Sequence, residues 1–473
     1  MLARQMKKLI IIIISFMLLW GGWYICYPYF LMWLEGFSFF STLQDFVPIY
    51  LHLPADVFHY MGSFLLQLYS SPVMGAAVQA LAPIVSLLCI WLVVKRLFTD
   101  PDTLFWLPFL ALPALVYSQL NDINLEKTCM ILTVSVVLAA VIYLVTCFVK
   151  PSCNLPGFMH HKLVFILVPM LSVLLSLCLI KTGPLSSQHE DVARLTYMGR
   201  QGNWDEIIQT VSRKDALSDD YKKKYMLLAL AQTDSLPEYA FKYGLKSSED
   251  FIITDIAGPW DMQYNIQFYR MLGLHNAVIY YAYQQSLQSL PGICSDAVRT
   301  LADTYIELKD YTLAKKYVDL LSHSLCNGKW LREHYVELES IKGLEPEYVM
   351  IGNHFVLQDF YKDLSSLVTR YPDEKKYVDI LLCGLLADKD GNTFMDVFDM
   401  VYEKHYKDAP HMPDVYQEAL CLVASHEPEI RDIYGIDENV WGRYCDFSAM
   451  MTQGKVSLAK RKYADTYWVY SYK

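Results

Sequence analysis

The hydrophobic pattern of the chain changes near residue 185. Before this point long apolar stretches recur, and after it apolar residues alternate with charged ones at helical spacing. A helix that spans a membrane needs about 20 mostly apolar residues, because its backbone must satisfy its own hydrogen bonds across ~30 Å of hydrocarbon. Five stretches meet or approach this length, and they are residues 9–32, 73–94, 103–120, 128–149 and 163–180.

Two details modify this membrane pattern. The third stretch contains Pro108 and Pro113, so it is the least regular of the five. A further apolar stretch, residues 57–70, is too short to span, and its His59 and Tyr60 are typical of a helix that lies in the membrane interface.

Residues 186–473 show no strand alternation. Helical stretches of about 12–16 residues are joined there by short turns of Gly, Asp, Asn or Pro. The segment 297–321 matches the tetratricopeptide pattern of two helices that approach through small residues, with aromatic residues filling the groove beside them. The matching positions are Ala302, Tyr305, Tyr311, Ala314 and Val318.

Weaker copies of the pattern surround this segment at a spacing near 34 residues, for example around Gly202 and Gly454. Stacking of at least three such units is expected, because one unit cannot bury its own apolar face. The predicted fold is therefore all-α, with a transmembrane bundle of about five spans (1–185) followed by a soluble tetratricopeptide-like α-solenoid (186–473). A nonrepetitive helical bundle is the alternative for the second part.

Charge adds an orientation. Of the 40 Lys and Arg and the 50 Asp and Glu residues, most follow residue 185, and the formal net charge is −10. An acidic surface argues against a nucleic-acid partner, which would need basic patches. Within the membrane part, basic residues at 4–8, 95–96, 150 and 162 fall on one side of five spans. The positive-inside rule then predicts a cytoplasmic N-terminus and an outside C-terminal domain, anchored in the lipid bilayer.

Three stretches carry a family resemblance: EGFSFFSTLQDF (35–46), FLLQLYSSPVMGAA (64–77) and YADTYWVYSY (463–472). With these stretches at both ends, the chain resembles an uncharacterised family of bacterial multi-pass membrane proteins that contains a domain of unknown function. The resemblance implies a bacterial inner membrane, and hence a periplasmic C-terminal domain. It implies no activity and no functional residues.

A search for chemistry finds no nucleotide-binding, zincin or nucleophile-elbow motif. The 11 cysteines include no C-x-x-C, so neither a cofactor nor a metal is predicted. The five cysteines after residue 185 are expected to be small buried hydrophobic residues. They are Cys294, Cys326, Cys383, Cys421 and Cys445.

Two functions fit these observations. The preferred one is a membrane-anchored interaction protein, whose helical repeats bind a protein or a glycan in the periplasm. The alternative is a divergent multi-pass glycosyltransferase that uses lipid-linked sugars, because acidic residues follow the first span and an interfacial helix comes next. Its candidate catalytic residues are Glu35, Asp45, Asp56 and His59. His52 lies in the same loop.

Overall fold

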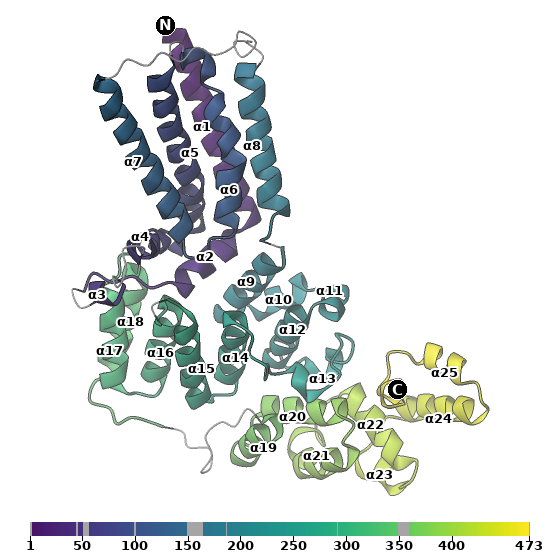
Figure 1. Ribbon diagram of the computed structural model, residues 1–473. Coiled ribbons are helices and arrows are strands. Elements are labelled where there is room, and N and C mark those ends of the chain that lie inside the picture. The colour runs from purple at the N-terminus through teal and green to yellow at the C-terminus, as the bar shows by residue number, and fades with distance from the viewer. Residues whose placement is uncertain are drawn as a thin grey trace. The chain divides into compact units, whose positions relative to one another are not determined.

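A computed structural model shows that the chain is built from helices (Figure 1). It describes residues 2–43, 46–50, 56–98, 101–148, 164–185, 187–290, 292–348 and 359–472. Within these ranges there is no β-strand, which confirms the all-α prediction.

The chain divides into two compact units. Unit 1 contains residues 1–194 and 282–347, and unit 2 contains residues 195–281 and 348–473. Each unit is therefore built from two separate stretches of the chain. The boundary predicted at residue 185 is where the hydrophobicity of the sequence changes. The two units, in contrast, are groups of residues that pack against one another.

Five helical segments of unit 1 are long and apolar enough to cross a membrane, as the hydrophobic pattern predicts. They are Gln5–Cys26 within α1 (Leu2–Cys26), Pro72–Leu97 (α5), Pro101–Leu120, Glu126–Phe148 (α7) and Val164–Thr182 (α8). In Figure 1 they run side by side, with α8 at one edge; α1 packs against α5 and α8, and α8 also packs against α6.

The first span is shorter than the predicted 9–32. Its helix ends at Cys26, and a separate helix α2 (Pro28–Phe37) follows. The residue before a proline is disfavoured in the α conformation, and Tyr27 accordingly adopts φ −140° and ψ 42°. The third span is also broken, into two 3₁₀ turns (Pro101–Leu104 and Leu107–Ala111) and α6 (Leu112–Leu120), where its prolines interrupt the helix.

Pro83 lies inside α5 and has no N–H to donate to the carbonyl of Gln79 four residues earlier. An unpaired carbonyl is costly inside a membrane. The side chain of Gln119 on α6 donates its amide to this carbonyl at 3.0 Å, and both glutamines are buried. The carbonyl that Pro83 leaves unpaired in one span is therefore satisfied by the side chain of Gln119 in another span.

The predicted interfacial segment 57–70 is helical, as α4 (Asp56–Leu66) and a 3₁₀ turn (Gln67–Ser70), preceded by the short α3 (Val47–Tyr50). Helix α4 packs against α7. The rest of unit 1 comprises most of α9 (Ser187–Arg200), the end of α15 (His275–Gln288), α16 (Ser295–Glu307), α17 (Tyr311–Ser322) and α18 (Gly328–Ser340).

Helices α16 and α17 form the hairpin that the segment 297–321 predicts. Ala302 and Ala314 are fully buried, as close helix approach requires. Tyr305 stacks on Tyr317 with ring centroids 5.7 Å apart, and Asp310 caps α17 by accepting a hydrogen bond from the backbone N–H of Leu313.

Unit 2 contains shorter helices. They are α10 (Trp204–Thr210), α11 (Arg213–Ser218), α12 (Asp220–Gln232), α13 (Leu236–Tyr239), α14 (Pro259–Met271), α19 (Phe360–Arg370), α20 (Lys375–Ala387), α21 (Gly391–His405), α22 (Asp414–Ala424), α23 (Glu429–Ile433), α24 (Glu438–Thr452), α25 (Val456–Lys462) and α26 (Tyr467–Ser471). Helices α12 and α13 pack on α20, and α13 also packs on α22, so the two stretches of this unit share one core.

One turn recurs between consecutive helices. A residue with positive φ ends the first helix, and the next N–H reaches back five residues to a carbonyl, which is the Schellman arrangement. Glycine occupies the positive-φ position in some turns, but Lys309 and Lys389 occupy it in others. The positive-φ residues of these turns are Gly202, Asp234, Gly244, Gly273, Lys309, Lys389, Gly435 and Gly454.

The prediction for the later cysteines holds in part. Cys294, Cys383 and Cys421 are buried, whereas Cys326 is half-buried and Cys445 is exposed. None of the described cysteines forms a disulfide.

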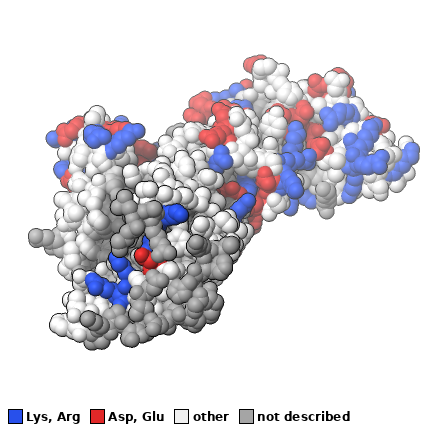
Figure 2. All heavy atoms as spheres, turned by 90° about the horizontal axis from the view of Figure 1, so that it is seen from above, with Lys and Arg blue, Asp and Glu red and all other residues white. Residues whose placement is uncertain are grey.

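The view from above looks onto the end of the membrane bundle. Blue Lys and Arg groups and a red carboxylate stand there within mostly uncharged surface (Figure 2). At this end Lys8 forms an ion pair with Asp102 and lies 4.7 Å from the ring centroid of Trp91.

The pairing of Pro83 with Gln119 can be tested in the full-length protein in detergent. Gln119→Met keeps the volume but removes the donor, which should cost roughly 0.6–1.7 kcal/mol. Pro83→Ala restores the N–H for the carbonyl of Gln79, so the same Gln119→Met change should then cost almost nothing. Thermal unfolding measures both, with Ser118→Ala as the control, because that hydroxyl bonds only to its own helix. Additive effects would disprove the pairing.

Candidate functional site

Glu35, the first acidic residue after the first span, lies buried on α2. Its two carboxylate oxygens accept hydrogen bonds from both terminal nitrogens of Arg299 on α16, at 2.9 and 2.6 Å. Asn327 accepts from the same guanidinium, at 3.2 Å from Nε and 2.6 Å from Nη2. The contact is a bidentate, charge-assisted pair, and Asn327 accepts from two further N–H groups of the guanidinium.

This pair is well shielded from water. The side chains of Glu35 and Arg299 are 7% and 19% exposed. Burial by itself would lower the pKa of Arg299, but the neighbouring Glu35 carboxylate outweighs burial and raises the pKa above its ordinary value. Arg299 therefore stays charged, and it depends on the neighbouring Glu35 side chain.

Further contacts extend this attachment. The carbonyl of Ser38 accepts from the N–H and hydroxyl of Ser295 at 2.8 and 2.7 Å. The backbone N–H of Thr42 donates to the carbonyl of His323, and Gln67 accepts from the N–H of Leu325. We call this set of contacts the junction. It comprises Glu35, Ser38, Thr42 and Gln67 on one side and Ser295, Arg299, His323, Leu325 and Asn327 on the other.

The beginning of α2 is held by a second carboxylate. Its N-cap residue, Tyr27, makes no capping hydrogen bond with its side chain. Glu190 of α9 accepts instead from the N–H groups of Tyr29 and Phe30 in the first turn, at 3.0 and 2.8 Å. Burial raises the pKa of Glu190 to about 7, although these two hydrogen bonds oppose the shift. Because the folded pKa lies above the ordinary value, the stability that the bound proton contributes is lost as pH rises from about 4.5 to about 7.

The other proposed catalytic residues are placed only in part. Asp56 lies in the first turn of α4, and the Nε2 atom of His59 is 3.2 Å from the carbonyl oxygen of Leu290. Asp45 and His52 lie outside the described residues. In the part of the chain that is described, no group of three or more His, Cys, Asp or Glu side chains is arranged to hold a metal ion. The structure thus shows Glu35 bound to Arg299, and catalysis by these residues stays a prediction.

Unit 2 contains a different kind of site, a cleft of about 710 Å³. This volume lies within the usual range for ligand pockets. Its walls come from α11, from the segment after α13, from the end of α20 and from the C-terminal segment. The polar and aromatic residues that line the cleft include Arg213, Phe241, Lys242, Lys246, Asp388, Lys389, Asp465 and Tyr470.

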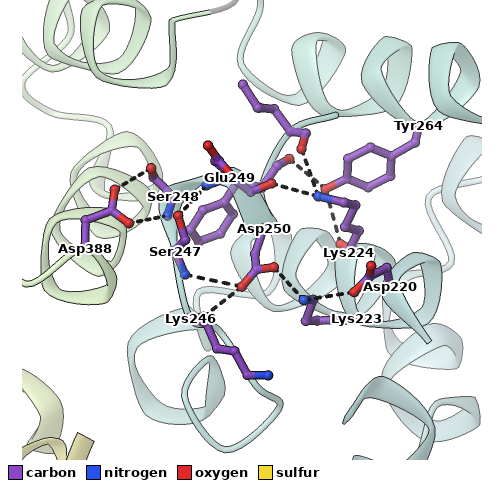
Figure 3. A network of polar contacts seen from close by, with 12 residues as sticks. Asp220, Lys223, Lys224, Lys246, Ser247, Ser248, Glu249, Asp250, Tyr264 and Asp388 are labelled. Carbon is purple, nitrogen blue, oxygen red and sulfur yellow. Dashed lines mark hydrogen bonds and ion pairs between the residues drawn. The ribbon is translucent and has the colours of Figure 1, made fainter. Parts of the chain in front are cut away.

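A polar network fixes the backbone of one wall (Figure 3). Asp250 accepts from the N–H groups of Lys246 and Ser247, and it pairs with the ammonium of Lys223 at 2.5 Å. Ser248 donates its N–H and hydroxyl to Asp388, at 3.0 and 2.5 Å. In Figure 3 the ammonium of Lys246 points away from this network.

Lys224 secures the same segment from behind. Its ammonium donates to the carbonyls of Glu249 and Ile252, at 2.8 Å each. Burial lowers the pKa of Lys224 to about 8. The loop that carries Lys246 is therefore held from both ends.

The charges at the cleft do not balance. Asp465 pairs with Arg213 at 3.3 Å, and Asp388 accepts from Ser248. The three exposed lysines Lys242, Lys246 and Lys389 have no carboxylate within ion-pair distance among the described residues. The hydrogen bonds from Ser248 do not cancel the charge of Asp388, so the four basic and two acidic side chains that line the cleft leave it with a net charge of +2.

The aromatic residues of the cleft are occupied. The rings of Phe241 and Tyr470 contact each other with centroids 5.0 Å apart. The hydroxyl of Tyr470 donates to the carbonyls of Lys246 and Ala387, at 2.7 Å each. These rings stabilise the wall, and the free groups at the cleft are ammoniums.

Sequence reasoning found Glu35 but missed Arg299. The available signal was a lone carboxylate in an apolar stretch, which requires a buried cation as a partner. The lysines of the cleft were missed because two separate segments bring them together, Lys242 and Lys246 after α13 and Lys389 after α20, and each one by itself looks like an ordinary exposed residue.

These features define an all-helical protein with five helices able to span a membrane. The family of unknown function DUF6057 matches residues 3–183 and 123–473, so the matches together cover almost the whole chain. The chain belongs to this family. Comparison with curated proteins and with solved structures gives no significant match to either.

The dependence of Glu35 and Arg299 on each other predicts a strong energetic coupling. Glu35→Met or Arg299→Met alone leaves a buried charge without its partner and should cost roughly 3–5 kcal/mol of unfolding free energy. The double replacement should recover most of this loss, because no charge is then stranded. Thermal unfolding of the full-length protein in detergent tests this, with Lys315→Met as a control that breaks an exposed ion pair. Costs that simply add would show that the pair is not coupled.

Proposed function

We propose that this protein is a membrane-anchored interaction protein, and that the cleft of unit 2 binds an acidic segment of a partner protein. The observation that carries the proposal is the group Lys242, Lys246 and Lys389, three ammoniums at one cleft that have no ion-pair partner among the described residues and leave its lining with a net positive charge. Carboxylates of an acidic peptide would supply the missing counter-charges. Complementary charge of this kind mainly provides partner choice and rapid association.

The chemistry of the cleft favours an acidic peptide over a neutral glycan. Neutral sugars are usually held by aromatic faces. The rings of Phe241 and Tyr470 meet edge to face, and Tyr470 also stacks on Tyr467, so these rings are engaged within the wall. The lysines, in contrast, are free to meet anionic groups.

The proposal includes tetratricopeptide-like stacking of the helix pairs. Four of the Schellman turns support it, since Gly202, Asp234, Gly273 and Lys309 lie about 30–40 residues apart, close to the period of such repeats. The buried small residues Ala302 and Ala314 of α16 and α17 support it as well. Stacked helix pairs provide the extended surfaces that peptide partners need.

The proposal also places the protein in a bacterial inner membrane, with its N-terminus in the cytoplasm and its later helices in the periplasm. Lys95 and Arg96 end α5, and Lys7 and Lys8 begin α1, so these charges belong to one side if each segment crosses once.

The glycosyltransferase alternative, with Glu35, Asp45, Asp56 and His59, requires more. Glu35 would have to leave Arg299 to act as a base or to bind a metal ion, and it would strand a largely buried guanidinium.

Reporter fusions test the orientation. A phosphatase fused after Lys473 should be active, because this reporter needs the periplasm, and a reporter that fluoresces only in the cytoplasm should be dark. A fusion after Phe98 should give the opposite pair of results. A bright cytoplasmic reporter after Lys473 would overturn the periplasmic assignment.

Binding of a fluorescent hexaglutamate peptide to the full-length protein in detergent tests the cleft. The triple variant Lys242→Gln, Lys246→Gln, Lys389→Gln should weaken binding about tenfold or more, since three charge contacts of a few tenths to 1 kcal/mol each are lost. The matched control is Lys404→Gln, Lys407→Gln, Lys455→Gln, which removes the same charge elsewhere on unit 2 and should bind like the parent.

Binding should also fall as salt is raised. Equal binding by both triple variants would refute the cleft. Binding of a neutral oligosaccharide in place of the peptide would refute the acidic partner.

A further inference from the structure

A groove of about 550 Å³ lies between α5 and α7 in unit 1, and it shares no residue with the junction. Helix α5 contributes Cys89, Leu92, Lys95 and Arg96, and helix α7 contributes Val136, Ala139, Ala140 and Tyr143. Both helices are membrane-spanning segments, so the groove opens where lipid would be.

The shape of the groove follows from its residues. Two consecutive alanines, Ala139 and Ala140, leave room on α7 where larger side chains would fill the space. Leu92 and Val136 line it and are 53% and 47% exposed, although both are apolar. An exposed apolar lining within a span is suited to a hydrocarbon chain.

One end of the groove is cationic. Lys95 and Arg96 stand in the last turn of α5, and in the described part of the chain neither has a carboxylate within ion-pair distance. The guanidinium of Arg96 lies over the ring of Tyr143, 4.0 Å from its centroid. Lys8 at the same end of the bundle is different, because Asp102 neutralises it.

We propose that this groove binds an anionic phospholipid. The phosphate lies against Lys95 and Arg96, and one acyl chain lies along Leu92, Val136 and Ala140. Basic pockets between transmembrane helices bind anionic headgroups in this way. A zwitterionic lipid fits less well, because its ammonium would approach two cations that have no carboxylate partner among the described residues. The inference rests on the membrane-spanning assignment and is independent of the acidic partner.

The test uses delipidated full-length protein in detergent and native mass spectrometry with added phosphatidylglycerol or phosphatidylcholine. The parent should retain phosphatidylglycerol at least about fivefold better than phosphatidylcholine. Lys95→Gln with Arg96→Gln should abolish this preference. The control, Lys127→Gln with Lys181→Gln, removes the same charge at the opposite ends of α7 and α8 and should keep it.

A second variant separates a lipid from a free anion. Ala140→Leu fills the groove while both cations remain, so it should reduce phosphatidylglycerol retention although the charge is unchanged. Equal retention of both lipids by the parent, or no effect of the Lys95 and Arg96 changes, would overturn the proposal. Full retention in Ala140→Leu, with displacement by inorganic phosphate, would show an anion site and would also overturn it.

Discussion

The contact on which unit 1 depends is the bidentate pair between Glu35 and Arg299. Removing two charges from water is expensive, and only good geometry with additional hydrogen bonds compensates for it. Here the Glu35 carboxylate accepts two hydrogen bonds from the Arg299 guanidinium, and Asn327 accepts two more. A buried ion pair adds little net stability compared with a pair of apolar side chains at the same positions. It does exclude other positions of the helix, because those would leave one charge buried without its partner. Its main effect is to fix the helix that follows the first span in one place.

The two ends of α2 show how this constraint is shared. At its beginning the helix dipole and the free N–H groups meet the carboxylate of Glu190, and near its end Glu35 meets Arg299. Both partners come from helices that follow the last span. The position of the short helix α2 is thus fixed at both ends by residues from the later part of the chain.

The sequence predicted what depends on composition and local pattern. The five spans and the hairpin of α16 and α17 are strong local signals, and they were found at nearly the right residues. The break at Tyr27 was missed, although Pro28 was a local signal for it. Turns such as that at Lys389 were harder to predict, because a lysine with positive φ resembles any exposed residue.

The candidate sites were less predictable, because each is formed by distant segments. Glu35 could be singled out as a carboxylate in an apolar stretch, but nothing near it in the sequence indicates Arg299. The cleft of unit 2 combines residues from near 213, 245, 388 and 470, so its charge imbalance is visible only after folding. Long-range pairing of this kind cannot be read from periodicity or spacing.

The separation of Glu35 and Arg299 along the chain affects how the protein is made. The two residues are 264 positions apart. At a synthesis rate of about 5–20 residues per second, Arg299 is added on the order of ten to fifty seconds after Glu35. During this interval all five spans can enter the membrane while the carboxylate of Glu35 still has no cation to meet. The spans can therefore insert before their attachment to α16 is complete. The attachment forms only after the ribosome has synthesised Arg299.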